Sequence, residues 1–255
     1  MRRRRPPCFQ PRRADAVTGR SPITGVVRRT GTIVILLLAT FGLVPRPAAA
    51  NPAAQTLNVD LYHPGVFAMQ ATWSWCTAAS VEIMRNIVLG QADHSAADQQ
   101  RFFDYMHAHD RYQIPAREGV DPQGFAAGLS HFVDARYAIV ASTTYYTAVR
   151  SAVVRLRRTG LPVALLVDAG RHAWVLTGFT ATADPALTST FRVIGVRVVG
   201  PLYGRQTLHG YDPPPDSRLS VDAFRQFLLP YHFKFGPTPW DGRYVTLQPI
   251  PRRIG

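Results

Sequence analysis

The chain has 255 residues, with 29 basic and 16 acidic side chains and a formal net charge of +13. Residues 1–50 hold ten of the basic side chains and one of the acidic ones, so the remaining 19 basic and 15 acidic side chains leave a net charge of only +4. This modest charge, without a basic run interleaved with aromatic residues, argues against a nucleic-acid-binding protein.

Residues 1–50 have the pattern of a secretory signal peptide. An arginine-rich start precedes the apolar run "TIVILLLATFGLV" at 32–44, which is shorter than the roughly 20 residues that a membrane span needs. Three alanines at 48–50 then provide an A-x-A cleavage site. We expect cleavage between Ala50 and Asn51, and a secreted or cell-envelope protein with no membrane span after cleavage. Arg28 and Arg29 leave a twin-arginine route open beside the favoured general secretory pathway.

Residues 51–255 are long enough for one domain. The segment "TLNVDLY" at 56–62 is a possible edge strand. Apolar residues at helical spacing then predict a helix from Trp75 or Cys76 to Leu89, which ends at Gly90.

Capping signals predict the next helices. Ser95 begins "SAADQQRFFDYMHAH" at 95–109, and Asp121 with Pro122 begins "DPQGFAAGLSHF" at 121–132. A short strand is expected at 137–140, followed by a fourth helix that ends at Gly160.

The pattern changes to strands from residue 162. Runs rich in β-branched and aromatic residues are typical of strands, and one more helix is expected between them. The strands are expected at 162–167, 172–179, 191–199 and 244–250, and the helix at 220–229. This order predicts an α+β fold in which an N-terminal helical half packs against an antiparallel β-sheet half, with a cleft between them.

Cys76 is the one cysteine after residue 50, so it has no disulfide partner within the predicted mature chain. At the start of a helix, unpaired backbone N–H groups and the helix dipole favour a thiolate. His172 begins the strand "HAWVLTGF" and can face that helix start as a base. Gln70, six positions before Cys76, can place its amide beside the Cys76 N–H and form an oxyanion hole.

The motif Q-x5-C at Gln70 and Cys76, followed by "HAWVLTG" from His172, resembles the papain-like cysteine peptidases. The compact secreted bacterial branch, which includes bacteriocin-processing peptidase-like proteins, is most similar. The resemblance implies a papain-like fold and an exported cysteine-type peptidase acting on a peptide or protein substrate. It also implies Cys76 as nucleophile, His172 as general base and later acid, and Gln70 as oxyanion donor, with a thioester intermediate and no metal or cofactor.

The third member of the triad departs from the family pattern. The family has an Asp or Asn after the next strand, whereas "VRVVGPLYG" has Gly200 there. Asp212 can take the role if residues 200–211 form an inserted hairpin, and we include it among the candidate catalytic residues. Asp184 is a less favoured choice, and a main-chain carbonyl or a water is another.

Other interpretations of these residues remain open. A free cysteine is commonly a small buried apolar residue, which would fit a catalytically silent papain-like binding protein. A cell-wall peptide amidase also fits, although no wall-binding repeat is present. His107 and His109 could suggest a metal, but residues two apart on a helix face different directions, so we expect no metal site. The sequence leaves the oligomeric state open.

Overall fold

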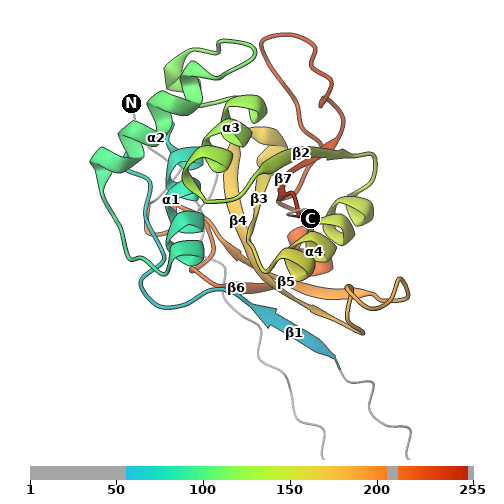
Figure 1. The fold of residues 1–255 in the computed structure, drawn as a ribbon. Helices are drawn as coiled ribbons and strands as arrows, with labels where there is room; N and C mark the ends of the chain where they lie inside the picture. The colour runs from blue at the N-terminus through green and yellow to red at the C-terminus, as the bar shows by residue number, and fades with distance from the viewer. Residues whose placement is uncertain (1–55, 206–211, 252–255) are drawn as a thin grey trace, which may run out of the picture. The chain divides into compact units, whose positions relative to one another are not determined.

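A computed structural model describes residues 56–205 and 212–251 (Figure 1). The predicted signal peptide at 1–50 lies outside these residues. The α-helices are α1 (Cys76–Leu89), α2 (Ala96–Ala108), α3 (Pro122–Phe132), α4 (Tyr145–Thr159) and α5 (Val221–Phe224). The strands are β1 (Leu57–Asp60), β2 (Tyr137–Ser142), β3 (Val163–Val167), β4 (His172–Ala181), β5 (Val193–Val199), β6 (Ser217–Ser220) and β7 (Tyr244–Pro249). Two short 3-10 helices are η1 (Ala116–Glu118) and η2 (Asp168–Gly170).

The described strands form one antiparallel sheet in the order β2-β7-β3-β4-β5-β6. On one edge of β4, β3 pairs with the first half and β1 pairs with the second half, from Asp60 opposite Gly178 to Leu57 opposite Ala181. Strand β5 pairs with the other edge of β4. The central strand β4 is therefore held from both sides, which fixes the position of its first residue, His172.

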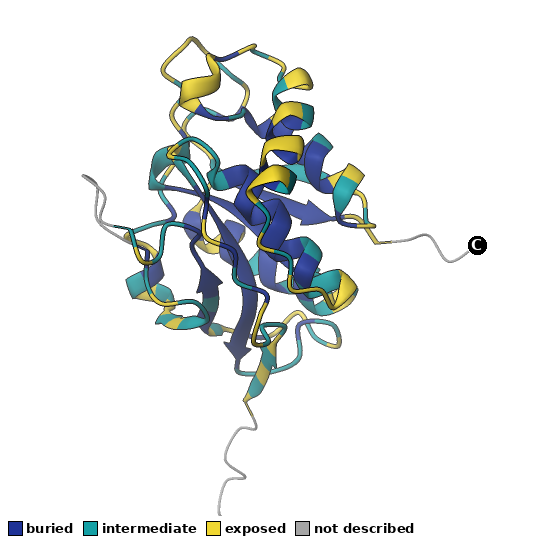
Figure 2. Cartoon of the chain, turned by 90° about the vertical axis from the view of Figure 1, so that its left-hand side faces the viewer, coloured by how far each residue is buried: buried dark blue, intermediate teal, exposed yellow. Residues whose placement is uncertain are grey.

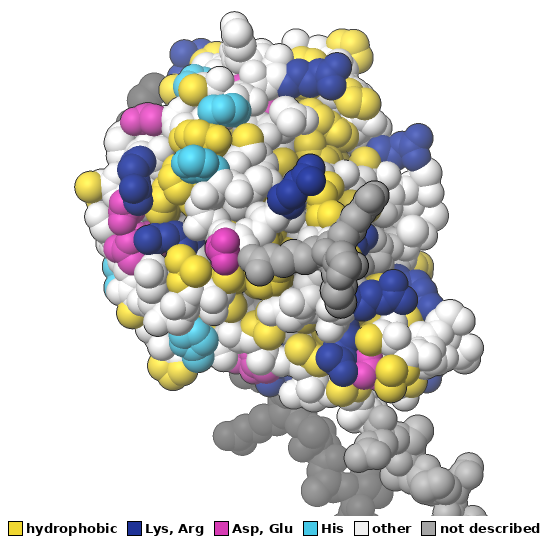
Figure 3. Space-filling view, viewed as in Figure 1, with side chains coloured by type: hydrophobic (Ala, Val, Ile, Leu, Met, Phe, Trp, Pro, Cys, Tyr) yellow, Lys and Arg dark blue, Asp and Glu magenta, His cyan; other side chains and the backbone are white. Residues whose placement is uncertain are grey.

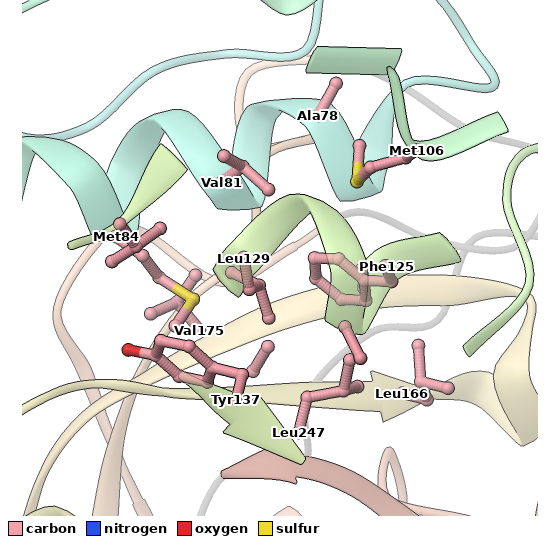
Figure 4. Packing of buried hydrophobic residues seen from close by; sticks show 14 of the residues in the cluster. Ala78, Val81, Met84, Met106, Phe125, Leu129, Tyr137, Leu166, Val175 and Leu247 are labelled. Carbon is pink, nitrogen blue, oxygen red and sulfur yellow. The ribbon is translucent and has the colours of Figure 1, made fainter. Parts of the chain in front are cut away.

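Helices cover both faces of this sheet. Ala164 and Leu166 of β3 pack with α1, α2 and α3, whereas Val163 and Leu165 pack with α4 and α5. This alternation follows from the two-residue period of a strand. Figure 2 shows the strands in the colour of buried residues, while the outer sides of the helices are exposed. Figure 4 shows side chains of α1 and α3, among them Val81 and Leu129, lying against the sheet.

The helix boundaries follow the local signals in the sequence. Gly90 and Gly160 end α1 and α4 with φ angles of 65° and 66°, which glycine adopts without strain. At the start of α2, Ser95 accepts a hydrogen bond from the backbone N–H of Asp98. At the start of α3, Asp121 accepts from the backbone N–H groups of Gln123 and Gly124. The α+β class and these helix positions are confirmed.

Two details of the expected fold are wrong. The fourth helix, α4, does not join the helical half but packs on the opposite face of the sheet, because its apolar stripe matches the residues Val163, Leu165 and Val167. The helix expected at 220–229 is a single turn, Val221–Phe224. The chain continues after Phe224 in hydrogen-bonded turns, and the backbone N–H of Asp168 binds the carbonyl of Phe227.

In the part of the chain that the structure describes, no helix is both long and apolar enough to cross a membrane. On the face seen in Figure 3, basic side chains lie scattered among acidic and apolar ones and do not gather into one patch.

Candidate active site

Cys76 is the first residue of α1, and no side chain caps this helix start. Trp75 occupies the N-cap position and makes no side-chain capping bond, and the first turn has no acidic residue. The backbone N–H groups there lack the usual side-chain acceptor, and the positive end of the helix dipole lies beside a half-buried thiol. The first turn of α1 therefore presents backbone N–H donors beside the Cys76 thiol.

A contact one turn further along α1 aligns the helix with β4. Ser80 Oγ donates to the carbonyl of Ala173 at 3.4 Å. Since Cys76 and Ser80 are four residues apart, they lie on the same face of α1. The contact therefore brings Cys76 to the end of β4 at which His172 lies.

His172 begins β4 directly after a tight turn. Asp168, Ala169 and Gly170 all have positive φ angles. At Gly170 a glycine is also required by space, because a Cβ atom there would lie 2.3 Å from the ring of Tyr231. The turn thus packs tightly on Tyr231 and sets the point where β4 starts.

The imidazole of His172 is bound by Asp212. Its Nε2 lies 2.9 Å from Oδ2 and 3.1 Å from Oδ1 of this carboxylate. Asp212 is buried and also accepts from Trp174 Nε1 at 2.7 Å and from the backbone N–H of Leu202 at 2.7 Å. Because His172 and Trp174 are two residues apart in a strand, both side chains reach the same carboxylate.

Gly200 makes room for this carboxylate. A Cβ atom on residue 200 would lie 2.3 Å from Cγ of Asp212. Position 200, where the papain-like pattern has its acidic or amide side chain, is thus filled by the side chain of Asp212. Asp184 lies elsewhere, since it forms an ion pair with Arg157 at 2.7 Å.

The charge state of His172 is set by its two partners. Burial alone would lower its pKa, but the hydrogen bonds that His172 makes to Asp212 and Cys76, together with the electrostatic interaction with both groups, raise the pKa to about 10. Since Nε2 binds Asp212, Nδ1 is the ring nitrogen left for Cys76. The raised pKa favours the protonated imidazole, which lies between Asp212 and Cys76.

Gln70 is completely buried in the loop before α1. Its Nε2 donates to the carbonyls of Thr72 at 2.8 Å and Trp73 at 3.2 Å, and its Oε1 is buried without a hydrogen-bond partner. Both N–H bonds of the amide are thus used within the loop. To donate to an oxyanion, Gln70 must release one of these carbonyls.

The remaining histidines singled out in the sequence have separate partners. His107 Nδ1 lies 2.9 Å from Asp110 Oδ2, and His109 Nδ1 lies 2.7 Å from the carbonyl of Tyr105.

Sequence reasoning missed Trp174 as a partner of Asp212. Its position two residues after His172 in a strand was the available signal, because it places both side chains on one face.

No model of a known protein family matches the chain, and no curated protein sequence matches it either.

Proposed function

We propose that the chain is an exported papain-like thiol hydrolase that cleaves peptide or amide bonds. The observation that carries the proposal is the arrangement of three side chains: Cys76 at an uncapped helix start, His172 that interacts with it, and the buried Asp212 bound to the other imidazole nitrogen. The α+β topology, with the cysteine at the start of α1 and the histidine at the start of β4, supports the papain-like assignment.

In the proposed reaction the Cys76 thiolate attacks the carbonyl carbon of the scissile bond, and the carbonyl oxygen becomes an oxyanion. The C–N bond then breaks, and His172 gives its proton to the leaving amine, which leaves a thioester on Cys76. His172, now neutral, takes a proton from a water molecule that attacks the thioester. The acid product leaves and the thiolate and imidazolium are restored.

The orientation of His172 is the contribution of Asp212. A carboxylate on Nε2 holds the ring plane and stabilises the imidazolium charge, while the bonds from Trp174 and Leu202 fix the carboxylate itself. The backbone N–H of Cys76 and the amide of Gln70 are the proposed oxyanion donors.

The alkylation rate of Cys76 tests the thiolate–imidazolium pair directly. The full chain with Cys8→Ser keeps Cys76 as its only thiol. We expect iodoacetamide to react at a nearly constant rate from pH 6 to 8, because in the proposed ion pair a cationic His172 beside Cys76 stabilises the thiolate over this range. An ordinary thiol has a pKa of about 8.5, and its alkylation rate falls about tenfold per pH unit below that value.

The His172→Ala variant is expected to react at least about tenfold more slowly at pH 6. His94→Ala is the matched control, because His94 is an exposed histidine outside this site and should leave the rate unchanged. A rate that follows an ordinary thiol, with no difference between the two histidine variants, would mean that Cys76 and His172 form no ion pair.

The shared space of residues 200 and 212 provides a second test. We expect Asp212→Gly to slow alkylation at pH 6 about tenfold, since His172 loses its carboxylate. Gly200→Asp alone is also expected to be slow, because its side chain meets Asp212. The double variant Gly200→Asp/Asp212→Gly is expected to react faster than either single variant, because one carboxylate again occupies the site. A double variant as slow as Asp212→Gly would contradict this role of Asp212.

One observation favours a catalytically silent binding protein as the second candidate. Both N–H bonds of Gln70 are used within its own loop. Normal ion-pair alkylation together with no hydrolysis of a peptide library would favour this candidate over the hydrolase.

A further inference from the structure

The loop that carries Gln70 is held by Gln99, a buried residue of α2. Gln99 Nε2 donates to the carbonyl of Met69 at 3.0 Å, and its Oε1 accepts from the backbone N–H of Ala71 at 2.8 Å. One amide thus binds the main chain on both sides of Gln70. The backbone N–H of Gln70 itself donates to the carbonyl of Pro201 at 2.9 Å.

The orientation of the Gln99 amide is set by Glu82, a residue of α1 with no exposed surface. Gln99 Nε2 donates to Glu82 Oε2 at 2.7 Å, and Glu82 Oε1 accepts from the backbone N–H of Ser95 at 2.9 Å. A carboxylate only accepts hydrogen bonds, so the nitrogen of the Gln99 amide must face it. If the amide turned over, its oxygen would face both Glu82 and the Met69 carbonyl, and the bonds to the loop would be lost.

Both carboxyl oxygens of Glu82 are hydrogen-bonded, although the side chain is completely buried. A buried carboxylate is costly to desolvate unless its hydrogen bonds are complete. The ionised form offers both oxygens as full acceptors to the two N–H donors, whereas a proton on one oxygen weakens it as an acceptor and adds an O–H donor beside Gln99 or Ser95. Burial, followed by the charges of Asp93 and Asp98, raises the pKa of Glu82 to about 7, although its bonds from Gln99 and Ser95 act in the opposite direction.

We propose that Gln99 is the positioning residue of the oxyanion-binding segment, and that ionised Glu82 sets the orientation in which Gln99 holds Gln70. The two Gln99 bonds to the main chain keep the backbone at residues 69–71 in place. The Gln70 side chain can then give up a hydrogen bond to a loop carbonyl and donate to the oxyanion instead. This inference rests on the proposed hydrolase function.

The test compares Gln99→Met with Gln100→Met in the full chain carrying Cys8→Ser. Methionine has nearly the volume of glutamine but cannot make these bonds, and Gln100 is an exposed neighbour on the same helix that binds only Asp104 among the described side chains. For a peptide that the parent chain hydrolyses, we expect Gln99→Met to lower kcat by about 10- to 100-fold, in line with a disturbed oxyanion donor. KM and the Cys76 alkylation rate should change less than about threefold, since neither depends on the oxyanion. Gln100→Met should match the parent.

The pH profile adds a readout that a merely structural role would not change. The charged groups near Glu82 are Asp93 and Asp98, which pair with Arg85 and Arg101. In the parent, kcat should rise as the pH passes about 7 and Glu82 ionises. In Glu82→Gln, the side-chain NH2 group at residue 82 faces either the Ser95 N–H or the Gln99 amide nitrogen, which are both donors, so one of the two bonds is lost at every pH. The kcat of this variant should therefore stay near the low-pH level of the parent.

The outcomes separate the two proposals. An active parent with normal kcat in Gln99→Met overturns the positioning role alone. Alkylation that slows as much as kcat also overturns it, because the change would then have reached Cys76 itself. A parent that hydrolyses no peptide overturns the hydrolase and, with it, this role of Gln99.

Discussion

Helices α1 and α3 pack on the same face of the sheet, but only α3 has a side chain that caps its N-terminus. At α3 the buried carboxylate of Asp121 accepts the backbone N–H groups of Gln123, Gly124 and Tyr112. At α1 the N-cap residue is Trp75, which provides no acceptor, and Cys76 follows it.

The other helices resemble α3. Ser95, Thr144 and Ser220 each accept a backbone hydrogen bond at the starts of α2, α4 and α5. Among the described α-helices, α1 alone therefore lacks a side-chain cap, and it is the one that begins with a cysteine. The difference indicates that an uncapped helix end is informative about function when neighbouring ends are capped.

The largest expected change in stability belongs to Asp121. We expect Asp121→Ala to lower the free energy of unfolding by about 3 kcal/mol, because three backbone N–H groups lose the same buried carboxylate as acceptor at about 1 kcal/mol each. Denaturant unfolding followed by circular dichroism measures this change. Thr144→Ala, which removes one exposed cap, is the matched control and should cost about 1 kcal/mol.

Both cap variants should leave the alkylation rate of Cys76 at its parent value while they are folded. If Asp121→Ala slowed alkylation as much as His172→Ala, the two helix starts would not have separate roles, and the comparison would fail.

The smallest expected change in stability belongs to Cys76. Cys76→Ser should alter the free energy of unfolding by less than about 1 kcal/mol, because the side chain is half-buried and provides no cap. The same change should lower peptide hydrolysis by at least about 10³-fold, since a serine hydroxyl does not ionise beside His172. If Cys76→Ser lost as much stability as Asp121→Ala, Cys76 would have a structural role like that of Asp121. The starts of α1 and α3 would then not differ in function.

Much of the fold was predictable because its signals are local. Gly90 and Gly160 end helices since they adopt left-handed φ angles. Ser95 and Asp121 begin helices by accepting backbone N–H groups within three residues, and the fixed φ of Pro122 suits the first helical position. The face on which α4 packs was not predictable from its own amphipathic pattern. That choice depends on which face of β3 presents Val163 and Leu165, which is a property of the assembled sheet.

Some residues of the candidate site could likewise be predicted from local sequence signals, and others could not. Cys76 and His172 could be identified because each begins an element with a recognisable pattern. Gln99 and Glu82 gave no such signal, since a glutamine and a glutamate on helices are ordinary surface residues until the two helices pack together.

What the sequence by itself determined is where the four long helices begin and end and where most of the strands lie, because hydrogen bonds of caps and turns connect near neighbours. What only the tertiary structure decided is which distant side chains share one space. Position 200 shows this most clearly: in the sequence Gly200 looks like a missing carboxylate, whereas in the fold its missing side chain leaves the room that Asp212 fills beside His172. Steric exclusion between residues twelve positions apart depends on the path of the chain after β5, which no local pattern encodes.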